Sequence, residues 1–232
     1  HNGLVQTITK DPRSSQGTTV ALNAGNQSTF SGRLRHAMVI NDKLSFKIMG
    51  EYTRGEEFEF ADSVYIDRRD EMGNPTPDGI PEGYEELELD NDFEFLRGEA
   101  ALYYSLNDES DLILSYGGSN STYLAPTNVG RNQIIDWKVN YYQLRYVSPR
   151  LFAQVYYTTS KTDDTYAIDE RTKQYYRLLD AGFSDAQARG EDSYASGARF
   201  VDDSRRWNAE LQYNISIGKA KVVVGAQFQR DI

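Results

Sequence analysis

Five oxygen-bearing side chains recur within one polar stretch of the sequence and could together bind a cation. They are Asp67, Asp70, Asn74, Asp78 and Glu82, and they stand among Gly and Pro residues in DRRDEMGNPTPDGIPEG. Carboxylate and amide oxygens on turn-forming backbone are ligands that Ca²⁺ takes in proteins. Because the stretch lacks the regular D-x-D-x-D-G spacing, it predicts either a calcium site or a solvated acidic loop, and the loop is the simpler interpretation.

Serines and carboxylates are plentiful, but few features of the sequence support a catalytic site. Cysteine is absent, and the histidines are His1 and His36, of which His36 shares the strand parity of Leu34 and Met38. The sequence contains no G-x-S-x-G, H-E-x-x-H or C-x-x-C motif and no glycine-rich phosphate-binding loop. A loop carboxylate alone would need a partner and a shifted pKa to act as an acid or base. We therefore expect no catalytic residue, no enzymatic activity and no cofactor beyond the calcium considered above.

The composition and net charge limit the classes of molecule that the protein could bind. The 232 residues carry 25 Lys and Arg against 35 Asp and Glu, a net charge of -10, which argues against nucleic acid because its phosphates would be repelled. No run of about 18 apolar residues could form a membrane-spanning helix. The chain has 17 Tyr and 10 Phe but a mean hydropathy of -0.66, so aromatic segments must alternate with very polar ones.

Alternating apolar and polar residues along the chain predict the β-strands that must position the loop residues. After a first strand at 18–24, apolar side chains such as Phe30, Leu34 and Met38 alternate with polar ones, and residues 44–54 repeat the pattern. Further pairs of alternating segments lie at 98–106 with 111–119, 139–147 with 151–160, and 205–215 with 221–229. The sequence therefore predicts about nine antiparallel strands, an all-β fold.

The connections between these strands alternate in length. Tight polar turns are expected near Asn41, Asn107, Ser148 and Gly218, whereas the intervening connections, apart from a short NQST after the first strand, are long: 55–92, 122–136 and 161–204. Long loops at one end of a sheet and tight turns at the other are the layout of an outer-membrane β-barrel. We expect any substrate to bind on these three loops, because binding residues concentrate on loops.

The third loop has helical texture within its polar sequence. Ser184 is a suitable N-cap, and Gly182 and Gly190 are suitable helix ends. This pattern predicts a short helical hairpin within 172–194, which either contacts substrate or braces its own loop.

Strand parity predicts two faces of opposite chemistry. One face is expected to meet lipid and carries Leu102, Leu114, Leu144, Val155 and Leu211, while the lumen face carries Arg33, Arg35, Lys47, Glu99, Arg145, Glu210 and Gln212. Aromatic residues on the apolar parity, many near strand ends, favour an interfacial girdle. A soluble β-sandwich with its apolar face turned inward would show the same alternation.

The N-terminal quarter carries a more specific pattern: Asn2-Gly3, Ile8, Thr9-Lys10, Gly25-Asn26 and Asn41-Asp42-Lys43, with an arginine-rich strand before the last. These residues are similar to the plug-to-barrel junction of TonB-dependent outer-membrane receptors, and the resemblance covers residues 3–60. It implies that residues 1–17 are the last plug strand and its link. Residues 18–232 would then be the N-terminal part of a transmembrane β-barrel of about 22 strands, incomplete at its C-terminal end.

The resemblance also implies a function. Such receptors lie in the cell outer membrane and import a scarce siderophore, vitamin, glycan or peptide, with energy from the periplasmic TonB protein acting through the plug. The expected partners are therefore outer-membrane lipid, TonB, the solute and, as a further option, a surface lipoprotein. Two alternatives stay open at this point: a passive porin or adhesion barrel, and a soluble β-sandwich binding module.

Overall fold

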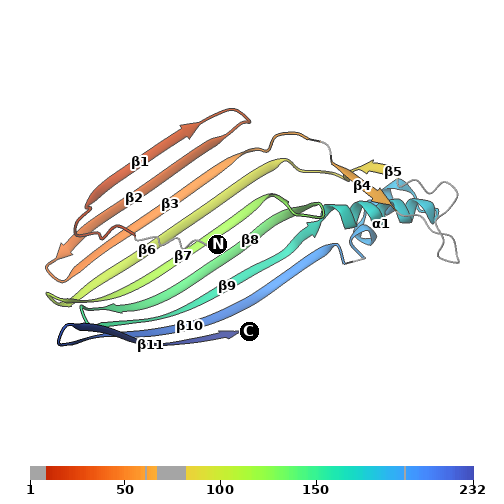
Figure 1. Ribbon diagram of the computed structural model, residues 1–232. Helices are drawn as coiled ribbons and strands as arrows, with labels where there is room; N and C mark the ends of the chain where they lie inside the picture. Colours follow the sequence, from red (N-terminus) through yellow and green to blue (C-terminus); the bar gives the residue numbers. More distant parts are fainter. Residues whose placement is uncertain (1–8, 61, 67–81, 196) are drawn as a thin grey trace.

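One large antiparallel sheet forms the body of the protein. The computed structural model describes residues 9–60, 62–66, 82–195 and 197–232, and within them the sheet has nine strands in the order β1-β2-β3-β6-β7-β8-β9-β10-β11 (Figure 1). Their bounds are β1 Gly17–Ala24, β2 Phe30–Asn41, β3 Leu44–Glu56, β6 Asp92–Asn107, β7 Ser110–Pro126, β8 Arg131–Val147, β9 Leu151–Ala167, β10 Arg199–Ile217 and β11 Ala220–Asp231. The predicted all-β fold with about nine antiparallel strands is confirmed.

The short turns form because each has a local chemical reason to reverse the chain. The Asn41 side-chain oxygen accepts hydrogen bonds from the backbone N–H groups of Lys43 and Leu44, both at 3.0 Å. In the third turn, the Ser148 hydroxyl donates to the Leu151 carbonyl at 3.0 Å. Gly218 has φ of 59°, a left-handed conformation that glycine adopts without steric cost. All four predicted turns lie where the sequence placed them.

The two faces of the sheet have the predicted parity, but their exposure is the reverse of that in a water-soluble sheet. Leu102 and Leu114 are 41% and 56% exposed, and Leu144, Val155 and Leu211 lie on the same outward face. Lys47 on the opposite face is only 6% exposed, with its ammonium 3.3 Å from a Glu99 carboxylate oxygen. Large apolar side chains therefore face outward, while the inner face buries charged and polar side chains together with a small apolar cluster of Ala101, Tyr103 and Ile113.

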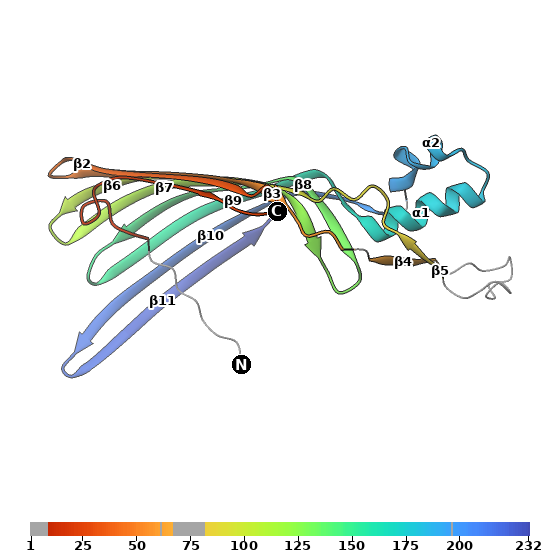
Figure 2. The ribbon, with the colours of Figure 1, turned by 90° about the horizontal axis from the view of Figure 1, so that it is seen from above.

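The sheet bends along its width, and residues 9–16 lie against its inner face (Figure 2). Arg13 makes two hydrogen bonds to the carboxylate of Asp111 on β7, at 2.8 and 2.7 Å. Arg35 on β2 donates to the Ser15 carbonyl at 2.9 Å and to the Ser15 hydroxyl at 2.6 Å. These contacts tie the link that precedes β1 to the polar face of the sheet.

The remaining elements gather at the end of the sheet opposite the short turns (Figure 1). They are the hairpin of β4 (Ser63–Ile66) and β5 (Glu82–Glu85), helices α1 (Ile168–Asp180) and α2 (Asp185–Ala188), and the 3-10 helix η1 (Glu191–Tyr194). The helical hairpin in the third loop is confirmed: Ser184 is the N-cap of α2, and Gly182, with φ of 88°, follows α1. None of the helices among the described residues is long and apolar enough to cross a membrane.

One expected loop is wrong. The sequence predicts a long connection over 122–136, but β7 continues to Pro126 and β8 begins at Arg131, so the connection is residues 127–130. The third loop is also shorter than expected, because β9 runs to Ala167 and β10 starts at Arg199. Strand pairing continues past a register shift between Ser121 and Tyr123 on β7 and into polar residues at the loop ends of β9 and β10, where alternation of hydropathy no longer marks it.

Candidate functional site

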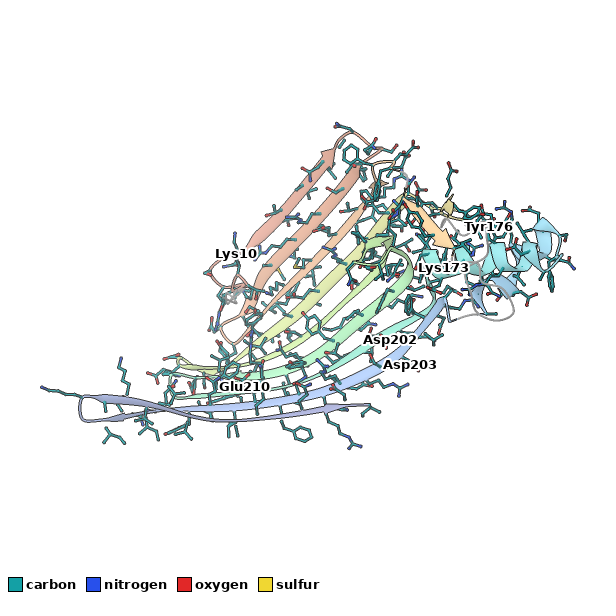
Figure 3. The ribbon with its side chains drawn as sticks, turned by 45° about the vertical axis from the view of Figure 1, so that its right-hand side comes forward. Lys10, Lys173, Tyr176, Asp202, Asp203 and Glu210 are labelled. Carbon is teal, nitrogen blue, oxygen red and sulfur yellow. The ribbon has the colours of Figure 1, made fainter. Side chains whose placement is uncertain are left out.

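The loop-end elements form one cap that brings together all three loops expected to bind substrate. A cavity of about 390 Å³ opens between β4, the 127–130 turn and α1. Its lining includes side chains from each of the three: Ser63, Tyr65, Thr127, Asn128, Asp169 and Lys173. Figure 3 shows Lys173 and Tyr176 on the cap, while Glu210 lies well down β10 toward the short turns. We take this cap as the candidate functional site.

Helix α1 is the element that organises the cap. Its buried residues Ile168, Arg171, Thr172 and Tyr175 recur at the spacing of one helix face, which is covered by the first loop. The Thr172 hydroxyl accepts the backbone N–H of Leu87 at 3.0 Å and donates to the Ile168 carbonyl at 2.7 Å. Leu87, Tyr175 and Ala188 pack as a small apolar cluster. The first loop and the third loop are therefore one packed unit.

A network of charges joins the same two loops. Arg171, only 4% exposed, donates to a Glu88 carboxylate oxygen at 2.6 Å, and Arg189 donates to the other oxygen at 3.2 Å. The Arg171 guanidinium also lies over the ring of Tyr194, 4.6 Å from its centroid. Burial alone would raise the pKa of the Glu88 carboxyl, but the hydrogen bonds and positive charges of the two arginines outweigh it and hold that pKa below its ordinary value.

A second ion pair anchors the first loop to the start of β8. Arg131 and Glu86 are paired with both side chains 4% exposed, and one of their hydrogen bonds, from Nε to Oε1, is 3.1 Å long. The Arg131 guanidinium also lies over the Phe60 ring, 4.2 Å from its centroid. Removing one partner of such a buried pair would leave the other charge uncompensated.

The chemistry of the cap is suited to holding a polar molecule. The cavity presents hydroxyl and amide groups from Ser63, Thr127 and Asn128. The Asp169 carboxylate is 3.0 Å from the Lys173 ammonium. Burial alone would lower the pKa of Lys173, but hydrogen bonds to Glu170 and Asp169 outweigh it and raise that pKa. Lys173 therefore carries a positive charge at neutral pH, and the carboxylates of Asp169 and Glu170 pair with it.

The calcium site proposed from sequence stays a prediction, because four of its five residues lie outside the part of the chain that the structure describes. Asp67, Asp70, Asn74 and Asp78 lie outside the described residues, and Glu82 begins β5. Among the residues that the structure does describe, no group of three or more His, Cys, Asp or Glu side chains is arranged to hold a metal ion. His36 lies on the outward face of β2, with Nδ1 2.8 Å from the Thr18 hydroxyl.

Sequence reasoning did not single out Arg171, Arg189 or Glu88. Arg171 nevertheless carries a signal, because it falls between Ile168 and Tyr175 on the apolar side of a helix. A positively charged side chain on the buried face of a helix indicates an oppositely charged partner from another part of the chain. The partner itself, 83 residues away, has no counterpart in the local pattern.

The comparisons with known proteins add no family to this geometry. A scan of the chain against protein-family models finds no match, and a search among curated proteins finds no significant relative.

Proposed function

We propose that this chain is part of a transmembrane β-barrel in the outer membrane, of the type of TonB-dependent receptors, which captures a scarce solute on its loops and imports it with energy from a periplasmic partner. A spanning sheet cannot leave its edge strands β1 and β11 unpaired in lipid. The proposal therefore requires further strands to complete the barrel.

The observation that carries the proposal is the position of the apolar band on the outward face. In register, His36 on β2 aligns through Ile48, Ala100, Tyr116, Tyr142 and Tyr157 with Trp207 on β10. On β2 the outward apolar stretch spans residues 30–40, so His36 lies near its middle. On β10 the stretch spans residues 207–217, so Trp207 is at its very start. The centre of the apolar stretch is therefore displaced along the strand direction between β2 and β10, relative to the hydrogen-bonded register.

This displacement has the size that a membrane would impose. It amounts to about six residues over the six strand steps from β2 to β10, or about 20 Å along the strands against about 29 Å across them. Strand β6 is intermediate, because its outward stretch 96–106 is centred just beyond the aligned residue Ala100. A flat apolar layer that contains all of these stretches would have its normal about 35° away from the strand direction. This angle lies within the strand tilt of outer-membrane barrels.

The other features support the transporter rather than a bare barrel. Residues 9–16 bind the polar inner face, where a plug would lie, through the contacts of Arg13 and Arg35 described above. The cap cavity, with its polar lining, lies at the end where long loops would meet the outside. A soluble β-sandwich would instead need a second layer over the apolar face, and within the described residues none covers it.

The membrane claim is tested by fractionation of the host cells. The protein should resist extraction by salt and alkaline carbonate and dissolve only with detergent, whereas a soluble sandwich would be released. Deleting residues 172–193 should weaken ligand capture but leave the protein in the membrane, because the deletion removes cap elements without touching the sheet.

The import claim is tested by uptake of candidate siderophores, vitamins, glycans and peptides in cells with and without the inner-membrane energy complex. Import that needs the complex supports the receptor. Uptake that persists unchanged without the complex would favour a passive porin.

A further inference from the structure

A groove crosses the outward face of the sheet where side chains are missing from the apolar band. Gly50 on β3 pairs with Gly98 on β6, and Gly98 pairs with Gly118 on β7, so three glycines stand in one cross-strand row. The groove over β6–β8 has a volume of about 670 Å³. At Gly98 an added Cβ would meet only the Met49 carbonyl oxygen, at 3.6 Å, so bare backbone forms the floor of the groove there, whereas the Asn140 side-chain oxygen covers Gly118.

The walls of the groove are apolar toward the middle of the band. Ile48, Leu96, Ala100 and the Tyr116 ring line it, and the Tyr116 hydroxyl donates to the Asn140 side-chain oxygen at 3.1 Å beside Gly118. An extended hydrocarbon chain fits such walls, because it gains contact with them and with the backbone of the floor.

The loop-side end of the groove carries a cation without a counter-charge. Lys138 on β8 lines the groove, is exposed, and makes no ion pair with any residue that the structure describes. Its cross-strand neighbour Lys161 is already paired with Asp163 at 3.3 Å. The Asp136 carboxylate accepts a hydrogen bond from the Asn120 amide at 2.8 Å instead of pairing with Lys138.

We propose that this groove binds one anionic phospholipid, with an acyl chain over Gly98 and the phosphate against Lys138. The inference rests on the proposed membrane location. Charge complementarity selects the occupant: Lys138 lies where the apolar band ends on β8, which is the depth of a lipid headgroup. An uncharged or zwitterionic lipid would leave the lysine without a net partner charge, and a water-soluble anion would leave the apolar walls exposed.

The test uses the protein as its host produces it, in nanodiscs of phosphatidylcholine with added phosphatidylglycerol of the same acyl chains. Native mass spectrometry counts the lipids retained after release. Gly98→Leu fills the floor, and its Cβ has room, since the nearest atom to an added Cβ is the Met49 carbonyl oxygen at 3.6 Å. Lys138→Ala removes the charge. Lys43→Ala in a short turn and Ala226→Leu on outward β11 are the matched controls.

Wild-type protein and both controls should retain one phosphatidylglycerol in clear preference to phosphatidylcholine. Lys138→Ala should reduce that preference about fivefold, and Gly98→Leu should abolish retention of either lipid at this position. Free glycerol phosphate should not compete, because it lacks the acyl chain.

The outcomes separate this inference from the proposed function. Carbonate extraction reads membrane insertion independently of lipid retention. Insertion with no preference for phosphatidylglycerol, or with unchanged retention in the two groove variants, would overturn the lipid site alone. Competition by glycerol phosphate would also overturn it, since a soluble anion would then suffice. Release of the protein by carbonate would overturn both proposals.

Discussion

Replacing Leu102 by arginine should reveal whether the outward face meets lipid or water. Leu102 lies near the middle of the β6 apolar stretch, which begins at Leu96 and ends at Leu106. The ten residue steps from Leu96 to Leu106 cover about 33 Å along the strand. With the strand tilted by about 35°, they cover about 27 Å along the membrane normal, close to the ~25 Å apolar band of outer-membrane barrels. Leu102 then lies about 11 Å from the nearer edge of the band, at Leu106, and Leu96 lies at the opposite edge.

The cost of the charge should therefore depend on depth. We expect Leu102→Arg to lower the free energy of unfolding by about 2 to 4 kcal/mol and Leu96→Arg by about 0 to 1 kcal/mol. On a face exposed to water, both changes would stay within about 0.5 kcal/mol. Leu102→Ala separates the loss of the leucine from the burial of the charge.

The measurement is guanidinium unfolding of the protein in phospholipid vesicles, followed by the fluorescence of Trp137 and Trp207. Equal costs for the two arginine variants would refute the depth argument. Costs below about 0.5 kcal/mol for both would refute the membrane location itself.

Two further predictions concern the cap and the link. Since the pKa of Glu88 is lowered in the folded protein, its stabilising contribution is present above the unfolded pKa and is lost as pH falls below about 4. Glu88→Gln should speed hydrogen exchange in α1 at pH 7 and weaken its acid dependence; an unchanged pH profile would contradict this role. Asp111→Asn should loosen Arg13, so that protease cleaves residues 9–16 faster while the sheet stays folded, whereas unchanged cleavage would show that Arg35 holds the link alone.

The strands and turns are predictable because their causes are local. Asn41, Ser148 and Gly218 each reverse the chain through their own side chain or backbone freedom. The 122–136 loop is predicted wrongly for a physical reason: the register shifts between Ser121 and Tyr123, and Asp136 has φ of 47°, so the alternation is interrupted although strand pairing continues beyond it. Hydrophobic alternation reports the band and not the full length of the strand.

The cap is less predictable because its contacts are distant in sequence. The helix and its N-cap Ser184 follow from local signals, but Arg171 meets Glu88 across 83 residues and Arg131 meets Glu86 across 45. No periodicity connects such residues. The cap as a polar cavity between three loops is therefore a property of the fold, although each loop is visible in the sequence.

Alternation within one strand does not show which face of the sheet meets water, because a sheet with its two faces exchanged would have the same pattern of apolar and polar residues. Register between strands breaks that symmetry. A soluble core need only match apolar residues opposite one another, so its apolar rows should follow the hydrogen bonds across the sheet. Here the outward stretch drifts by about one residue per strand from β2 to β10, from a centre close to His36 to one well beyond Trp207. A drift of constant sign places the apolar residues in one plane oblique to every strand, and a flat external solvent layer is the simplest cause of such a plane.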